Sequence, residues 1–249
     1  MVDRVIIVTG GGSGIGKAIA QKFADAHDHV IIMGRTESKL RSTSDEIGDN
    51  VSYIVADVSQ RDSIENAIQQ ITEQHSTIHV IVNNAGFVRG LHVGIPLDEA
   101  ETIWEQEVGT NLKGSMLLSV GLSAYLSRPK GRIINIGSIA AYTGGSRGGV
   151  IGYAAAKAGL HGLTVALARE LSPDGITVNT ISPGLIVDTD FFGGQLSPER
   201  VQAVSDAVPL GRPGHPHEIA ETVFFLASDG ASYITGEVLH VNGGWLFGH

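Results

Sequence analysis

Two kinds of hydrophobic pattern alternate along the chain. Short runs of mostly β-branched apolar residues, with little polar interruption, are typical of strands that are covered on both faces. Such runs occupy residues 4–9, 29–34, 51–56, 78–83, 132–138, 175–182 and 237–242. Longer segments with helical spacing of apolar residues lie between them and predict helices at residues 14–26, 36–47, 60–74, 99–126, 152–172 and 216–228.

This alternation predicts the fold class. Strands that alternate with helices form βαβ units, whose right-handed crossovers build a parallel sheet. No repeat, linker or change in composition marks a domain boundary. We therefore expect a single α/β domain over residues 1–249, a Rossmann-like doubly wound parallel sheet of about seven strands with helices on both faces.

The segment 184–213 interrupts this rhythm. It contains a Gly-Gly pair, three prolines and a single short helical stretch at about 197–207. Ligands of doubly wound sheets bind beyond the carboxyl ends of the strands, and long irregular segments tend to be functional. We expect a substrate lid here, and a plain surface loop is the alternative.

Composition narrows the function. The chain has no cysteine, which excludes disulfides, thiolate catalysis and cysteine-based zinc sites. It has no apolar run of the ~18 residues that a membrane span needs, and its formal net charge of −9 argues against nucleic acid as a partner. We expect a cytoplasmic protein without a metal site, because even the pair His215 and His217 lies in a Pro/Gly-rich turn.

A glycine-rich stretch, TGGGSGIG at residues 9–16, joins the first predicted strand to the first predicted helix. The free N–H groups and the dipole of a helix N-terminus favour a phosphate there. Gly10 permits a tight turn, Gly14 leaves room for a pyrophosphate, and Gly16 allows the helix to pack closely on the sheet. The stretch therefore predicts a dinucleotide site.

The spacing of this turn is T-G-x-x-x-G-x-G, and further motifs follow it in the chain. They are Asp57, Asn83-Asn84-Ala85-Gly86, Asn111, Ser138, Tyr153 with Lys157, Pro183-Gly184 and Val241-Asn242-Gly243-Gly244-Trp245. In this order, over essentially the whole chain, they resemble the short, single-domain branch of the short-chain dehydrogenase/reductase family. Within that branch the chain is most similar to the 3-oxoacyl-[acyl-carrier-protein] reductases.

The resemblance implies a set of cofactor-binding residues. Asp57 and Val58 would flank the adenine, and Asn83, Ala85 and Gly86 would line the path of the cofactor. Asn83 or Asn84 would also tie neighbouring strands together. The full set is Gly10, Gly12, Ser13, Gly14, Ile15, Gly16, Arg35, Asp57, Val58, Asn83, Ala85, Gly86, Tyr153, Lys157, Pro183, Gly184, Ile186 and Thr189.

The end of the second predicted strand indicates which nicotinamide is used. A carboxylate there usually holds the ribose of NAD and would repel a 2′-phosphate. Gly34 occupies that position and Arg35, whose guanidinium suits a phosphate, follows it. We expect NADP(H). NAD(H) is the alternative, because Ser13 fills a position where NADP-dependent relatives often carry a second basic residue.

Tyr153 and Lys157 are four residues apart on one predicted helix, so their side chains share a face. A neighbouring cation favours the phenolate of a tyrosine, whose pKa is otherwise ~10, and this makes Tyr153 a general acid and base. Ser138 is placed to donate to a substrate oxygen. By resemblance, Lys157 binds the nicotinamide ribose and Asn111 holds a water in the proton path.

We expect an oxidoreductase that transfers hydride between nicotinamide and a ketone or secondary alcohol, either a free molecule or an acyl thioester. Candidate pocket residues are Leu91, Ile139, Tyr142, Leu185, Phe191 and Phe192. Related carrier-protein reductases resemble each other in basic residues beside the entrance. This chain has Pro129 and Asp174 at those positions, with Arg128, Lys130, Arg132 and Arg169 close by.

The resemblance also implies a homotetramer, formed through the segments 99–126 and 152–172 and the C-terminal Gly-Gly-Trp-Leu-Phe. Two functions of other classes stay open. One is a sensor that binds NADP(H) without turnover, and the other is a scaffold protein that has reused the fold. A pure sensor has no need of the complete Asn-Ser-Tyr-Lys set, so that set favours the enzyme.

Overall fold

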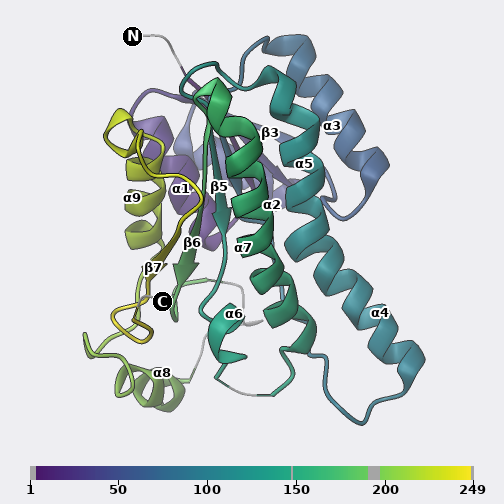
Figure 1. Cartoon of the computed structure of the whole chain (residues 1–249), viewed down its shortest axis with the longest axis vertical. Coiled ribbons are helices and arrows are strands. Elements are labelled where there is room, and N and C mark those ends of the chain that lie inside the picture. The colour runs from purple at the N-terminus through teal and green to yellow at the C-terminus, as the bar shows by residue number, and fades with distance from the viewer. Residues whose placement is uncertain (1–3, 147, 190–196, 248–249) are drawn as a thin grey trace.

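The computed structural model describes residues 4–146, 148–189 and 197–247. Within these ranges, seven parallel strands form one sheet in the order β3-β2-β1-β4-β5-β6-β7 (Figure 1). The strands are β1 (Val5–Thr9), β2 (His29–Gly34), β3 (Val51–Val55), β4 (Val80–Asn83), β5 (Arg132–Ile136), β6 (Thr177–Pro183) and β7 (Val238–Val241). The predicted fold class is confirmed.

Helices cover both faces of the sheet (Figure 1). They are α1 (Gly14–Asp25), α2 (Glu37–Ile47), α3 (Arg61–Gln74), α4 (Leu97–Val108), α5 (Gly114–Leu122), α6 (Ala140–Thr143), α7 (Ile151–Leu171), α8 (Pro198–Ser205) and α9 (Pro216–Leu226). On one face, α1, α2 and α9 contribute to one hydrophobic cluster, and on the other, α3, α5 and α7 contribute to a second.

The two clusters explain why the strand segments are almost uninterrupted apolar runs. Successive side chains of a strand point to opposite faces of the sheet. In β1, Ile6 and Val8 join the cluster under α1 and α9, whereas Val5 and Ile7 join the cluster under α3 and α5. Because both faces are covered, every position of such a strand has to be apolar.

One predicted helix differs in the structure. The segment 99–126 is not continuous, because a π-helical turn at Gly109–Lys113 separates α4 from α5, and a 3₁₀ turn at Ser123–Tyr125 ends it. At the junction the backbone approaches the loop after β3 closely, since a Cβ at Gly114 would lie 2.8 Å from the carbonyl oxygen of Val58. The short helix α6 has no counterpart in the sequence prediction.

A chain of buried hydrogen bonds connects the middle strands to the helices above them. Asn83 Nδ2 donates to Ser119 Oγ at 2.9 Å and to Asn135 Oδ1 at 2.8 Å. Asn135 Nδ2 donates to Thr164 Oγ1 at 2.8 Å, and Thr164 Oγ1 bonds Thr180 Oγ1 at 2.7 Å. Buried polar groups need such partners. The network therefore ties β4, β5 and β6 to α5 and α7.

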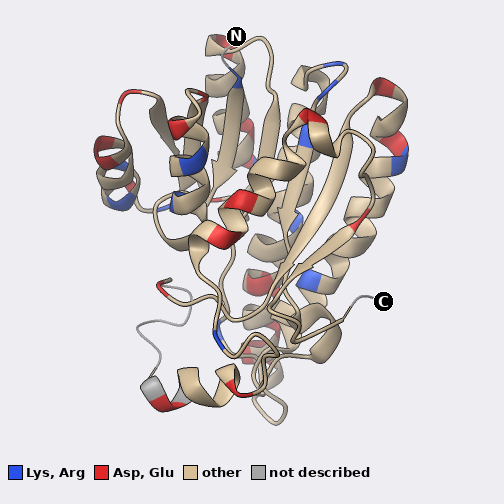
Figure 2. Ribbon diagram, turned by 90° about the vertical axis from the view of Figure 1, so that its left-hand side faces the viewer, with Lys and Arg blue, Asp and Glu red and all other residues tan. Residues whose placement is uncertain are grey.

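Acidic and basic positions are interspersed over the helices in Figure 2. The basic residues near the start of β5 lie at the amino edge of the sheet in this chain. Arg128 pairs with Asp174 at 2.9 Å, Lys130 pairs with Asp229 at 3.0 Å, and Arg132 is buried. A residue that begins a parallel strand is a strand's length away from the carboxyl edge, where ligands bind.

No helix within the described ranges is both long and apolar enough to cross a membrane.

Candidate active site

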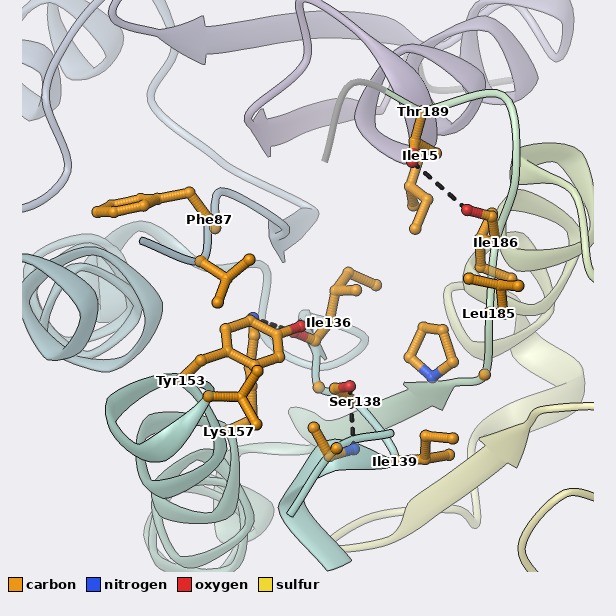
Figure 3. Close-up of a pocket in the computed structure, with 18 of the residues that line it drawn as sticks. Ile15, Phe87, Ile136, Ser138, Ile139, Tyr153, Lys157, Leu185, Ile186 and Thr189 are labelled. Atoms are coloured by element: carbon orange, nitrogen blue, oxygen red, sulfur yellow. Dashed lines mark hydrogen bonds between the residues drawn. The ribbon is translucent and has the colours of Figure 1, made fainter. Parts of the chain in front are cut away.

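A cavity of about 490 Å³ opens at the carboxyl ends of the central strands (Figure 3). Its walls come from the glycine turn after β1, the segments after β4, β5 and β6, the start of α7 and one residue of α8. Among its lining residues are Gly10, Ser13, Gly14, Ile15, Asn84, Ala85, Gly86, Phe87, Val88, Ser138, Ile139, Val150, Tyr153, Lys157, Leu185, Ile186, Thr189, Val204 and Trp245.

The glycine turn is compact and tied to its neighbour strand. Gly10 adopts a φ of 69°, and a side chain at Gly16 would collide with the carbonyl group of Gly10. Thr9 Oγ1 accepts hydrogen bonds from the backbone N–H groups of Asn84 and Ala85, each at 2.9 Å. Thr9 is not among the predicted site residues, although its place before the first glycine, at the end of a strand, is a signal for this role.

The N-terminus of α1 fits a pyrophosphate. Ser13 is the N-cap residue, and within the described part of the chain its side chain makes no capping hydrogen bond. The first N–H groups of a helix have no partner inside the helix. Ser13, Gly14 and Ile15 line the cavity, so these donors lie at its wall. A Cβ at Gly14 would approach Thr189 to 3.3 Å, which shows how closely segment 184–189 covers the turn.

Tyr153, Lys157 and Ser138 border the same cavity (Figure 3). Tyr153 is buried, and this burial raises the pKa of its phenol to about 12, although a hydrogen bond with Ser138 acts in the opposite direction. Burial also lowers the pKa of the Lys157 ammonium to about 7. The Lys157 Nζ donates to the carbonyl oxygen of Ile136 at 2.7 Å and lies 5.7 Å from the centroid of the Tyr153 ring.

Burial dominates both pKa values, and this modifies the sequence-based picture of the pair. We expected the lysine cation to favour the phenolate. In the structure the phenol stays protonated at neutral pH, and a lysine with a pKa of about 7 is only partly charged there. In the chain alone, burial therefore determines the protonation of Tyr153.

Asn111 lies close to Lys157, in the π-helical turn Gly109–Lys113. Its Nδ2 donates to the backbone oxygens of Phe87 and Glu107, both at 2.9 Å. Its Oδ1 is buried without a hydrogen-bond partner among the described residues. A Cβ at Gly86 would lie 2.6 Å from this oxygen and 3.4 Å from Lys157 Nζ. Asn111 thus presents an unused acceptor close to the lysine, where a water molecule fits the chemistry of both groups.

The predicted cofactor residues divide into two sets. Those that line the cavity are Gly10, Ser13, Gly14, Ile15, Ala85, Gly86, Tyr153, Lys157, Pro183, Gly184, Ile186 and Thr189. Those outside its lining are Gly12, Gly16, Arg35, Asp57, Val58 and Asn83. Asn83 belongs to the buried network described above. Its hydrogen bonds to Ser119 and Asn135 agree with the expected tie between strands.

Arg35 and Asp57 follow the ends of β2 and β3. Arg35 is exposed, with its guanidinium carbon 5.6 Å from the centroid of the Phe87 ring. Asp57 Oδ1 accepts from the backbone N–H of Ser59 at 2.9 Å and from its hydroxyl at 2.7 Å, and Val58 packs into the core. The first carboxylate after β2, that of Glu37, is paired with Arg41.

The predicted substrate residues are only partly brought together. Ile139 and Leu185 line the cavity, whereas Leu91 lies outside the lining, where it pairs with Val150 in an isolated bridge. Tyr142 also lies outside the lining and contacts the imidazole of His161, with the ring centroids 4.9 Å apart. The other two candidates, Phe191 and Phe192, fall outside the described residues. Apolar lining that the sequence did not single out comes from Phe87, Val88, Val150, Val204 and Trp245.

Across the described ranges, no cluster of three or more His, Asp or Glu side chains is placed to hold a metal ion. His215 instead bonds Asp188 at 3.0 Å through Nδ1 and stacks on His217.

Comparisons with known proteins agree with this geometry. The family described as enoyl-(acyl carrier protein) reductase matches residues 10–246. The 3-oxoacyl-[acyl-carrier-protein] reductase FabG of Vibrio cholerae serotype O1 is 42% identical to this chain over 242 residues, 97% of this chain and 96% of the relative. The reductase of the same name from Escherichia coli is 40% identical with the same coverage.

A solved structure is similar over almost the whole chain. It is a short-chain dehydrogenase/reductase, titled glucose/ribitol dehydrogenase, from Brucella melitensis. The TM-score is 0.90 at 30% sequence identity, and the match covers 99% of this chain and 98% of the other.

Proposed function

The chain belongs to the short-chain dehydrogenase/reductase family and is an oxidoreductase that uses a nicotinamide nucleotide, and from this premise we propose that it reduces the ketone of a 3-oxoacyl thioester with NADPH. The observation that carries the proposal is the meeting of Ser138, Tyr153 and Lys157 at one cavity, beside an uncapped helix N-terminus. The curated relatives named as 3-oxoacyl-[acyl-carrier-protein] reductases support the substrate class.

A nicotinamide nucleotide held by these residues would supply the hydride for the carbonyl carbon. The chain's own groups act on the carbonyl oxygen. The Ser138 hydroxyl donates a hydrogen bond to that oxygen as negative charge develops on it. Tyr153 transfers its phenolic proton to the same oxygen, so that a secondary alcohol leaves and a phenolate remains to be reprotonated.

Lys157 and Asn111 serve the proton supply. An ammonium beside the phenolate stabilises the charge that Tyr153 acquires after proton transfer. The unused Oδ1 of Asn111 lies close to Lys157 and is suited to hold a water between the lysine and solvent. Burial keeps the phenol protonated, with a pKa of about 12, so Tyr153 is available to donate its proton when the carbonyl group is reduced.

Arg35 supports NADPH over NADH. It is an exposed cation directly after β2, where a carboxylate would repel the 2′-phosphate. Its position over the Phe87 ring is also compatible with stacking on an adenine. Gly12 and Asp57 complete the adenosine side of this proposal.

We also propose that the chain is a single domain in which segment 184–213 acts as a substrate lid, and we propose which kind of molecule carries the acyl group. Thr189 packs against the glycine turn and Val204 of α8 lines the cavity, which supports a lid role for the described parts of this segment, 184–189 and 197–213. Residues 190–196 of the expected lid lie outside the described residues. The apolar lining suits an alkyl chain. Because Arg128 and Lys130 are paired and Arg132 is buried, Arg169 is the exposed basic residue that remains of those named above, and we propose a small thioester such as one on coenzyme A in preference to an acidic carrier protein.

The test follows NADPH consumption with acetoacetyl-coenzyme A for the wild type and Tyr153→Phe. We expect kcat to fall by about 10² to 10⁴ in the variant, with NADPH binding retained. Tyr233→Phe, at a fully exposed tyrosine, is the matched control. Turnover in Tyr153→Phe close to that of the wild type would refute the mechanism. Nucleotide binding without turnover in the wild type would favour a sensor.

A further inference from the structure

Glu107 is a fully buried acidic side chain that the proposed reaction does not use. It lies in the last turn of α4, four residues before Asn111, and none of its surface is exposed. A buried carboxylate is costly unless hydrogen bonds and nearby positive charge compensate it. The groups that compensate Glu107 therefore indicate its role.

One carboxylate oxygen holds the segment that follows β4. Glu107 Oε1 accepts hydrogen bonds from the backbone N–H of Arg89 at 2.6 Å and from that of Gly90 at 3.2 Å. Phe87 and Val88, directly before these amides, line the cavity. Glu107 does not line the cavity itself, but it thus holds in place the backbone next to two residues of the cavity wall.

The other oxygen faces the start of the helix that carries Tyr153. A Cβ at Gly152 would lie 2.5 Å from Glu107 Oε2, so α7 approaches the carboxylate as closely as glycine allows. Oε2 makes no hydrogen bond within the described ranges. The free N–H groups and the dipole at the N-terminus of a helix favour a negative charge there. The carboxylate thereby couples α4 to the residue that precedes Tyr153.

The two walls also contact each other directly. Leu91 and Val150 pair in a parallel bridge. The His92 ring lies against Gly149, whose φ is 87° and where a Cβ would lie 2.5 Å from His92 Nε2. Glu107, segment 89–92 and segment 149–152 therefore each contact the other two.

We propose that Glu107 is a positioning residue, which joins the 89–92 wall of the substrate pocket to the N-terminus of α7 and so sets the distance between bound substrate and Tyr153. The inference rests on the proposed function for its kinetic readouts, but the joining of the two walls is measurable without turnover.

The charge of Glu107 gives a second readout, because it adds to the burial that raises the pKa of Tyr153. The other ionisable side chain in the described lining of the cavity is Lys157, on the same helix as Tyr153. The ionisable side chains on the neighbouring elements are those of Arg89 and His92 in segment 89–92 and that of Tyr142 in α6. The Arg89 guanidinium bonds Gln106 at the surface, so it does not neutralise the carboxylate.

The first experiment measures amide hydrogen exchange in Glu107→Ala and Glu107→Gln. We expect the amides of Arg89 and Gly90 to exchange at least about tenfold faster in the alanine variant, which has lost their acceptor, and to stay protected in the glutamine variant, which retains one oxygen. Glu105→Gln, at an exposed acid of the same helix, is the control. Unchanged exchange in Glu107→Ala would overturn the proposal.

The second experiment compares kinetic constants. For Glu107→Ala we expect the KM for acetoacetyl-coenzyme A to rise about tenfold, with the KM for NADPH within about twofold of the wild type, and rescue of the substrate KM by Glu107→Gln. In the oxidative direction, Glu107→Gln should move the rising limb of the pH–rate profile to lower pH by about half a unit or more, because Tyr153 loses a nearby negative charge. Equal changes in both KM values, or an unmoved limb, would contradict this role.

A double-mutant cycle tests the contact with α7. Gly152→Ala should displace the carboxylate and raise the substrate KM, and this effect should shrink when Glu107 is already alanine. Gly162→Ala, at an open position of the same helix, is the control. Additive effects would refute the contact. If the wild type shows no turnover, the proposed function fails and the exchange data still decide the role of Glu107. If Glu107→Ala does not fold, exchange in Gly152→Ala decides it, with protection at Arg89 and Gly90 equal to that of the wild type counting against the proposal.

Discussion

Lys157→Met will make the nucleotide-free protein more stable at pH 7. Burial lowers the pKa of this ammonium from 10.5 to about 7, a gap worth about 5 kcal/mol at low pH. Methionine has a similar length and no charge. The substitution loses the hydrogen bond from Nζ to the Ile136 carbonyl, worth about 1 kcal/mol, and the contact of Nζ with the Tyr153 ring. We expect a net gain of about 3 kcal/mol at pH 7.

The gain depends on pH in a defined direction. Between pH 7 and 10.5 the unfolded chain binds this proton and the folded chain does not, so the wild type becomes more stable as pH rises through that window. Relative to Lys157→Met, the wild type should gain about 2 kcal/mol between pH 7 and pH 9. Below pH 7 both states are protonated, and the difference between the proteins levels off.

The assay is urea unfolding of both proteins at pH 6, 7, 8 and 9, at one protein concentration and without nucleotide. Lys113→Met, at an exposed lysine, is the control and should show no such pH-dependent difference from the wild type. If the free energies of unfolding of wild type and Lys157→Met run parallel over this range, the ammonium is not destabilised by burial and the reasoning is refuted.

Two further variants test the cofactor side and the core. Arg35→Ala should raise the KM for NADPH about tenfold or more and leave the KM for NADH nearly unchanged, since the lost cation serves the 2′-phosphate; steady-state kinetics with both nucleotides check this, and equal changes would count against the assignment. Asn135→Ala should lower the free energy of unfolding by about 3 kcal/mol, because Asn83 and Thr164 lose buried partners. Urea unfolding measures this loss, with the exposed Asn50→Ala as control, and a loss below about 1 kcal/mol would contradict it.

Much of the fold could be predicted from the chain because its strands are covered on both faces, and uninterrupted apolar runs follow directly from that arrangement. The break in segment 99–126 could not. It lies where Gly109 and Gly114 meet the loop after β3, and a Cβ at Gly114 would lie 2.8 Å from the Val58 carbonyl oxygen. Local sequence does not reveal a contact across about 50 residues.

In the candidate site, too, features set by local spacing could be predicted, and features set by distant contacts could not. Tyr153 and Lys157 were expected to share a face because four-residue spacing on a helix is local, and both border the cavity. The surroundings of Asn83 and Arg132 depend on the face or edge of the sheet that each residue occupies. Local sequence does not give that position. Glu107 was missed as one acid among several on α4, although it follows Ile103 and precedes Asn111 at four-residue spacing, on the buried stripe.

The buried hydrogen-bond network has a consequence for how this protein can diverge. Ser138 follows β5, and Tyr153 and Lys157 lie on α7; Asn135 and Thr164 join these two elements through a buried hydrogen bond. The segments that contribute lining residues to the cavity, at 87–88, 139–146 and 184–189, are connected to these two elements but are not members of the network. Substrate preference can therefore be exchanged by grafting these loops, with the reacting groups left in register. Directed evolution should accumulate new specificities in the loops and lose library members wherever the network is altered.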